Sequence, residues 1–143
     1  PLGLSLVDVG VNATGVDVDP NIISAVKEGR MPFHEPGYDD LIASGKFVVH
    51  GTPDVVSKSA VIIMTVGTPL HNHIETDLSQ IQRVLESIKD HIRKGQLIIL
   101  RSTVAPATTA YVHKWLERNT PFAAGKAILH SFCPERIADG VAY

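Results

Sequence analysis

Two short apolar runs constrain the fold of this chain more than any other feature. Residues 60–66 (AVIIMTV) and 96–100 (QLIIL) are almost continuously hydrophobic. Continuous hydrophobicity, in place of alternation, is typical of strands that are buried on both faces of a parallel sheet. Between these runs, residues 77–94 carry apolar side chains at intervals of three and four, which predicts an amphipathic helix. The pattern therefore favours parallel strands that are connected by helices.

The same alternation of strands and helices extends along the rest of the chain. Shorter strands are expected at residues 11–17, 46–50 and 126–130. Further helices are expected at residues 1–10, 20–28 and 39–43, and from Pro53 and Pro106 onward. Proline fits the first turn of a helix because it has no N–H to satisfy. The chain is thus predicted to be an α/β domain with a Rossmann-like, doubly wound parallel sheet and helices on both faces.

The composition excludes several classes of protein. A chain of 143 residues that is 44% hydrophobic and 20% charged has the size and core of one ordinary domain. Its net charge of −2 argues against a nucleic-acid partner, which requires clustered Lys and Arg. Cys133 is the single cysteine, so no internal disulfide can form, and no apolar run is long enough to span a membrane. We expect a cytoplasmic domain without a membrane partner.

Polar or proline-containing segments follow the predicted strands directly. Asp17 ends the strand at 11–17, and the other interruptions are residues 66–69, 101–104 and 131–136. In an open parallel sheet, ligands bind beyond the carboxyl ends of the strands. An acid at the position of Asp17 accepts hydrogen bonds from the ribose hydroxyls of a dinucleotide. The alternative interpretation is an acid in an ordinary strand-to-helix turn.

Several chemically active side chains have simpler interpretations. His71 and His73 have the spacing of metal ligands, but no third ligand of fitting spacing is near. We therefore expect a solvated loop there and no metal site. Trp115 and Phe132 are expected to lie in the core, and Cys133 is expected to pack under a strand end.

A dinucleotide-binding sheet also has a first strand and a glycine-rich turn before the helix that precedes Asp17. The sequence begins directly with that helix, and Gly3 and Gly10 do not have the Gly-x-Gly-x-x-Gly spacing. We therefore expect residues 1–143 to be a piece of a nucleotide-binding domain, truncated at both ends. The first strand of such a sheet lies between its neighbours, so we expect chain upstream of Pro1 or a partner's strand to take this place. The piece alone is expected to bind its dinucleotide poorly.

Six short motifs occur in order along the chain. They are GVDVD at 15–19, EPG at 35–37, VGTPL at 66–70, DLS at 77–79, STV at 102–104 and CPERI at 133–137. In order and spacing, essentially the whole chain resembles the N-terminal NAD-binding domain of the UDP-glucose/GDP-mannose 6-dehydrogenase family. Arg101 before Ser-Thr, and Cys133 before Pro-Glu-Arg, look most like the UDP-N-acetyl-mannosamine dehydrogenase branch.

The resemblance implies an enzyme of polysaccharide biosynthesis that oxidises the C6 alcohol of a UDP-sugar to a carboxylate in two NAD-dependent steps. The sugar is expected to be UDP-N-acetyl-mannosamine or UDP-glucose. In such enzymes a cysteine further along the chain forms a thioester that water hydrolyses, and by position Cys133 is not that cysteine. The full-length protein is expected to be a homo-oligomer, a dimer. The alternatives are a non-catalytic nucleotide-binding or interaction module and another dehydrogenase of the wider 6-phosphogluconate-dehydrogenase-like group.

The resemblance also implies roles for individual residues. Five residues would contact or line the path of the cofactor: Asp17, Val66, Thr68, Thr103 and Asp139. Asp17 would hold the adenosine ribose, Thr103 would help to place the reactive water near the nicotinamide, and Glu135 would be the general base in thioester hydrolysis. Thr103 and Glu135 each follow a predicted buried strand, where a polar side chain needs a partner or a function. The chain departs from the family pattern at residues 105–107, where Ala-Pro-Ala replaces the usual Pro-Pro-Gly, and at Asp139, where some relatives have a longer Glu.

Overall fold

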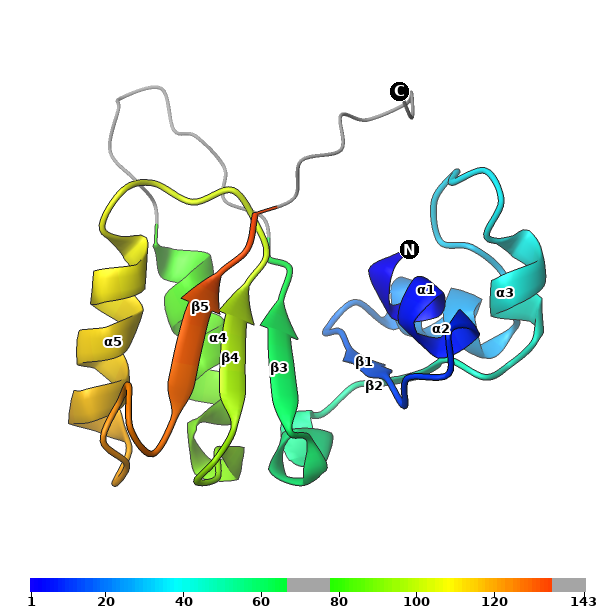
Figure 1. The fold of residues 1–143 in the computed structure, drawn as a ribbon. Coiled ribbons are helices and arrows are strands. Elements are labelled where there is room, and N and C mark those ends of the chain that lie inside the picture. The colour runs from blue at the N-terminus through cyan, green and yellow to red at the C-terminus, as the bar shows by residue number, and fades with distance from the viewer. Residues whose placement is uncertain (67–77, 135–143) are drawn as a thin grey trace. The chain divides into compact units, whose positions relative to one another are not determined.

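The computed structural model describes residues 1–66 and 78–134 of the chain. The chain divides into two compact units, residues 1–55 and residues 56–143 (Figure 1). All described strands pair in parallel, in a two-stranded sheet β1–β2 and a three-stranded sheet β3–β4–β5. The predicted alternation of parallel strands with helices is therefore confirmed. Within the described ranges, no helix has the length and apolar character needed to cross a membrane.

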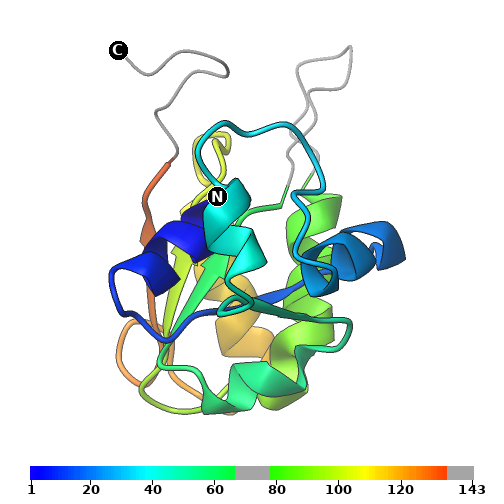
Figure 2. The same cartoon turned by 90° about the vertical axis from the view of Figure 1, so that its right-hand side faces the viewer.

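The first unit is a two-stranded sheet with three helices. β1 (Thr14–Val16) pairs with β2 (Val48–His50), and both are shorter than the sequence predicts. α1 (Leu2–Asp8) and α3 (Asp39–Ala43) lie side by side (Figure 2), and α2 (Pro20–Lys27) contacts β2. The buried core of this unit consists of Leu4, Val26, Ile42 and Val49.

α2 begins where the sequence predicts it. The Oδ1 atom of Asp19 accepts a hydrogen bond from the backbone N–H of Asn21 at 2.8 Å, and Pro20 occupies the first helical position. Gly29 follows the helix with φ +70°, a left-handed conformation that favours glycine. The helix is thus bounded by local side-chain and backbone chemistry at both ends.

The second unit is a three-stranded sheet with β4 (Leu97–Leu100) in the middle, between β3 (Val61–Met64) and β5 (Leu129–Phe132). The strands point the same way in Figure 1, so their carboxyl ends lie along one edge. α4 (Ser79–Ile88) and α5 (Thr108–Asn119) pack against the sheet in one core. The buried side chains of this core are Val56, Met64, Ile81, Leu85, Ile88, Ile92, Ile98, Leu100, Val112, Trp115, Leu116, Ala124 and Ile128.

Two predicted α-helices are partly replaced by tighter turns. The helix predicted from Pro53 is a 3-10 helix, η1 (Pro53–Lys58). The predicted long helix divides into α4 and a 3-10 turn, η2 (Lys89–His91). Arg93 caps this end of the helix, because its Nη1 donates to the carbonyls of Asp90 and Ile92, each at 2.8 Å. The orphan carbonyls of the helix end thus have a charged partner.

The strand predicted at 126–130 begins too early. Residues 125–127 form a turn, in which the N–H of Ala127 donates to the carbonyl of Ala123 at 2.7 Å. The fully buried Ile128 comes after this turn and forms an isolated parallel bridge with Ala124. The predicted strand therefore includes part of a turn and an isolated bridge that precede β5. The prediction that Phe132 belongs to the core is also wrong: it is 42% exposed, on a strand that pairs on one side only among the described strands.

A buried glutamine joins three segments at the start of β4. Gln96 is 3% exposed, and its Nε2 donates to the carbonyls of Val56 at 2.6 Å and Ser59 at 2.7 Å. Its Oε1 accepts the N–H of Arg93 at 2.7 Å. One side-chain amide thus satisfies three backbone groups at this end of the sheet, where water has little access.

His130 of β5 packs against His113 of α5. The ring centroids are 5.1 Å apart and the ring planes meet at 42°. Nδ1 of His130 is buried and has no hydrogen-bond partner within the described part of the chain, while Nε2 of His113 lies 3.5 Å from Oε1 of Glu117. Burial, and to a smaller extent the neighbouring His113 imidazole, lowers the pKa of His130 from its ordinary value of 6.5.

We expect the folded state to lose stability when the pH falls below 6.5. The unfolded chain takes up a proton on His130 near that pH, whereas the folded chain takes it up only at lower pH, so acidification favours the unfolded state. One proton contributes a slope of at most about 1.4 kcal/mol per pH unit. Urea unfolding at several pH values should show that His130→Leu removes most of this slope. Equal slopes in both proteins would contradict the assignment.

Candidate functional site

Asp17 lies directly after β1, in the turn that leads into α2. Its N–H donates to the carbonyl of His50 at 3.1 Å, which extends the pairing of β1 with β2. Its Oδ1 accepts the N–H of Asp19 at 2.9 Å, so the carboxylate is fixed within the turn. Oδ2 has no hydrogen-bond partner among the described residues, and the side chain is half-buried. A fixed carboxylate with an open acceptor oxygen fits the hydroxyls of a ribose.

A hollow of ≈ 490 Å³ opens beside this turn. Asp19 and Asn21 line it from the start of α2, and Met31 and Phe33 line it from the loop that follows the helix. Phe33 is 50% exposed, so its ring is available at the surface. Apolar side chains beside a fixed acid are suited to a flat base attached to a hydroxylated sugar.

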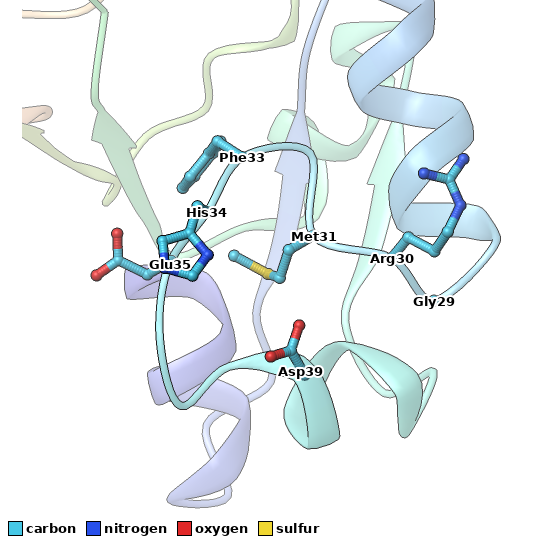
Figure 3. Close-up of a pocket in the computed structure, with 7 residues that line it drawn as sticks. All are labelled: Gly29, Arg30, Met31, Phe33, His34, Glu35 and Asp39. Carbon is cyan, nitrogen blue, oxygen red and sulfur yellow. The ribbon is translucent and has the colours of Figure 1, made fainter.

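A neighbouring hollow, also of ≈ 490 Å³, extends along the same loop (Figure 3). Its lining residues are Gly29, Arg30, Met31, Phe33, His34, Glu35 and Asp39. In Figure 3 the Met31 side chain extends toward His34, while the Arg30 guanidinium points away from it. The Nε of Arg30 donates to Glu28 at 3.0 Å, so this cation already has a carboxylate partner. The charge of Arg30 is therefore used mainly at the end of α2.

Gly3 lets α1 approach the segment before β2 closely. A Cβ at this position would overlap the ring of Phe47, with Cζ only 2.6 Å away. The absence of a side chain at residue 3 therefore allows the ring of Phe47 to pack directly on α1.

At the carboxyl ends of β3 and β4, Ser102 bonds to Val66. Oγ of Ser102 donates to the carbonyl of Val66 at 2.5 Å, and the N–H of Arg101 donates to the carbonyl of Met64 at 2.9 Å. Thr103 follows Ser102 and is exposed. The structure therefore brings Val66 and Thr103 to the same edge of the sheet, as the sequence predicts.

Arg101 connects the carboxyl end of β4 to that of β5. Its Nη1 donates to the carbonyls of Cys133 at 3.2 Å and Pro134 at 2.6 Å. The N–H of Cys133 donates to the carbonyl of Leu100 at 2.9 Å, which continues the ladder beyond the strands. The thiol of Cys133 is exposed, with Sγ 4.0 Å from Nη1 of Arg101. The prediction that Cys133 packs under the strand end is therefore wrong, since Cys133 directly follows β5, a strand whose residues are mostly exposed.

Some of the residues considered in the sequence lie outside the described part of the chain. They are Thr68, His71, His73, Glu135 and Asp139. Asp17 belongs to the first unit, and Val66 and Thr103 belong to the second. No group of three or more metal-ligating side chains occurs among residues 1–66 and 78–134. The contact partners of Arg101 and Ser102 were not predicted, although two polar residues directly after a buried strand indicate that such partners are needed.

Three comparisons with known proteins agree on one family. Residues 1–143 match the UDP-glucose/GDP-mannose dehydrogenase family, NAD binding domain. The UDP-N-acetyl-D-mannosamine dehydrogenase of Methanococcus aeolicus is 30% identical over 144 residues, which are 98% of this chain and 32% of that protein. The UDP-glucose 6-dehydrogenase of Rhizobium meliloti is 31% identical over 148 residues, which are 98% of this chain and 33% of that protein.

A solved structure with the same architecture is the UDP-D-ManNAc dehydrogenase from Pyrococcus horikoshii. It matches with a TM-score of 0.89 and 27% identity, over 96% of this chain and 34% of that one. The predicted Rossmann-like fold is thereby confirmed. The chain spans about a third of the length of the proteins that it matches.

The segment after Thr103 contains a strained residue. Ala107 precedes α5 with φ +70°, and it is the one residue other than glycine with positive φ within the described ranges. A Cβ in this left-handed region costs about 1–2 kcal/mol. The position is the one where the family pattern has glycine in Pro-Pro-Gly. Alanine at residue 107 therefore carries backbone strain that glycine at the same position would not carry.

We expect Ala107→Gly to stabilise the protein by about 1 kcal/mol, because glycine relieves this strain. The matched control is Ala110→Gly, the same change at an exposed position inside α5, which should destabilise by about 1 kcal/mol. Urea unfolding of both variants measures the two signs. A loss of stability in Ala107→Gly would contradict the expectation.

Proposed function

This chain belongs to the UDP-glucose/GDP-mannose dehydrogenase family, and we propose that it is the NAD-binding part of an enzyme that oxidises a UDP-sugar. The enzyme converts the C6 alcohol of the sugar to a carboxylate in two steps, in each of which NAD accepts a hydride. The observation that carries the cofactor part of the proposal is Asp17, a fixed carboxylate with an open oxygen at the end of β1.

In this proposal two groups of residues contact different parts of NAD. Asp17 accepts hydrogen bonds from the adenosine ribose, and the hollow lined by Met31 and Phe33 offers an apolar surface for the adenine. At the other strand ends, Val66 and Thr103 line the path toward the nicotinamide. Thr68 and Asp139 contact the cofactor as well in this proposal, by their place in the motifs.

Glu135 is the general base for the last step of the proposed reaction. It takes a proton from the water that attacks the thioester carbonyl, the C–S bond breaks, and the cysteine leaves as a thiolate. Thr103 helps to place that water. The cysteine lies in the part of the full-length protein that follows this domain.

The proposed sugar is N-acetyl-mannosamine, and glucose is the second candidate. Relatives of both specificities match the chain at 30% and 31% identity. Arg101 before Ser-Thr, and Cys133 before Pro-Glu-Arg, favour the first. The full-length enzyme is proposed to be a cytoplasmic dimer of polysaccharide biosynthesis. A non-catalytic nucleotide-binding module is the alternative function.

The full-length protein should reduce NAD with one of these two UDP-sugars, with two NADH formed per sugar, followed by absorbance. The kcat/KM value should be higher for NAD than for NADP. Asp17 would repel a 2′-phosphate, and the residue after it is Val18, with no positive charge to pair with one. A preference for NADP would remove this role of Asp17. Binding of NAD without reduction by any UDP-sugar would favour the non-catalytic alternative.

Asp17→Ala should weaken NAD binding by about 1.5–3 kcal/mol, the value of a lost charge-assisted contact. Asp17→Asn is the matched control, because its side-chain oxygen can still accept the N–H of Asp19 and hold the turn. Calorimetry should show weaker binding in both variants, with the larger loss in Asp17→Ala. Unchanged affinity in both would remove Asp17 from the site.

A further inference from the structure

We propose that Glu28 is a specificity-determining residue, which neutralises the guanidinium of Arg30 and thereby helps the site to reject NADP. The inference rests on the proposed function, in which Asp17 and the hollow beside it bind the adenosine end of NAD. NADP differs from NAD by a phosphate on the adenosine ribose, so this end of the cofactor decides between the two. Glu28 and Arg30 both belong to the first unit and lie just after α2.

Arg30 provides the positive charge of the hollow that opens beside the Asp17 turn. Among the described side chains that line this hollow, Asp19 is the one anion and Arg30 the one cation. Asp19 is connected to the proposed ribose site, because its N–H donates to Oδ1 of Asp17 at 2.9 Å. In dinucleotide-binding sheets, an arginine near the ribose acid accommodates the 2′-phosphate of NADP. A site that prefers NAD therefore needs the charge of Arg30 to be cancelled.

The backbone of Arg30 is fixed at the end of α2. Its N–H donates to the carbonyl of Ala25 at 2.9 Å, and the N–H of Gly29 donates to the carbonyl of Val26 at 3.0 Å. With Gly29 at φ +70°, these two bonds form a helix end of the Schellman type. The side chain of Arg30, in contrast, is 64% exposed. The partner of the guanidinium, and not the backbone, therefore decides where this charge is directed.

The carboxylate of Glu28 is prearranged as that partner. Its Oε2 accepts Nε of Arg30 at 3.0 Å and Nη2 at 2.5 Å, and its Oε1 accepts Oγ of Ser24, one turn earlier, at 2.8 Å. The hydrogen bonds from Arg30 and Ser24 lower the pKa of Glu28, so the carboxylate stays ionised. Arg30 lines both hollows and Glu28 lines neither. A phosphate in the hollow therefore competes for Arg30 with a carboxylate that is already held in place.

The chain offers a matched control in the second unit. Oε2 of Glu86, in α4, accepts Nζ of Lys89 at 3.0 Å. The side chain of Glu86 is 41% exposed and that of Glu28 is 52% exposed, so both carboxylates belong to ion pairs at the surface. Glu28→Gln and Glu86→Gln make the same change in net charge, but Glu86 has no contact with Arg30 among the described residues.

The test measures the Kd values of NAD and NADP for the full-length protein by calorimetry. Asp17→Asn is the background, because it removes the repulsion between Asp17 and the 2′-phosphate. In this background Glu28→Gln should strengthen NADP binding about three- to fivefold, the range expected for an exposed ion pair, with NAD binding nearly unchanged. The gain should shrink at high salt, since exposed charges are screened. Adding Arg30→Met should abolish the gain, and Glu86→Gln should produce none.

Three results would overturn the inference. They are an unchanged ratio of the two Kd values in Glu28→Gln, an equal change of this ratio in Glu86→Gln, and a gain that survives Arg30→Met. The proposed function is tested separately, by the NADH that the wild type forms with a UDP-sugar. A wild type that binds NAD but oxidises no UDP-sugar would contradict the proposed enzyme, while the ratio of the Kd values still decides the role of Glu28.

Discussion

The hydrogen-bond ladder of β4 is the interaction on which the second unit depends. β4 pairs in parallel with β3 on one side and β5 on the other, and Ile98 and Leu100 are 0% and 2% exposed. A strand with two neighbours satisfies its backbone groups on both sides, so it can be fully apolar. Polar side chains are then restricted to its two ends. Gln96 stands at one end and Arg101 with Ser102 at the other, and their contacts set the spacing of the neighbouring segments.

The candidate site residues of the two units are held in place by different kinds of contact. In the first unit a local turn fixes two carboxylates, because Asp17 and Asp19 each accept a backbone N–H from the second residue along. In the second unit, contacts between residues more than thirty positions apart gather the strand ends, as the bonds from Arg101 and Ser102 show. The first arrangement can be read from a short stretch of sequence. The second needs the sheet to be assembled.

This difference explains how much could be predicted. The apolar runs, the helix periodicity and the cap formed by Asp19 and Pro20 are local signals, and they predicted the fold class and the place of Asp17 correctly. Boundaries were wrong where burial came from tertiary packing, as at Ile128, which is fully buried in an isolated bridge with Ala124 before β5 begins. Exposure was wrong at Phe132 and Cys133, because the position of a strand at the edge of a sheet is not a local property. The partners of Arg101 could not be predicted for the same reason.

The contact between Gly3 and Phe47 links two positions that are far apart in the sequence. A Cβ at residue 3 would overlap the aromatic ring in its present place, so the side chains at the two positions share one space. A homologous sequence with alanine or serine at the first position would need a displaced ring or a smaller side chain at the second. In distant relatives, the packing of α1 on the segment before β2 should therefore be recognised from covariation of residues 3 and 47, and not from the identity of either residue.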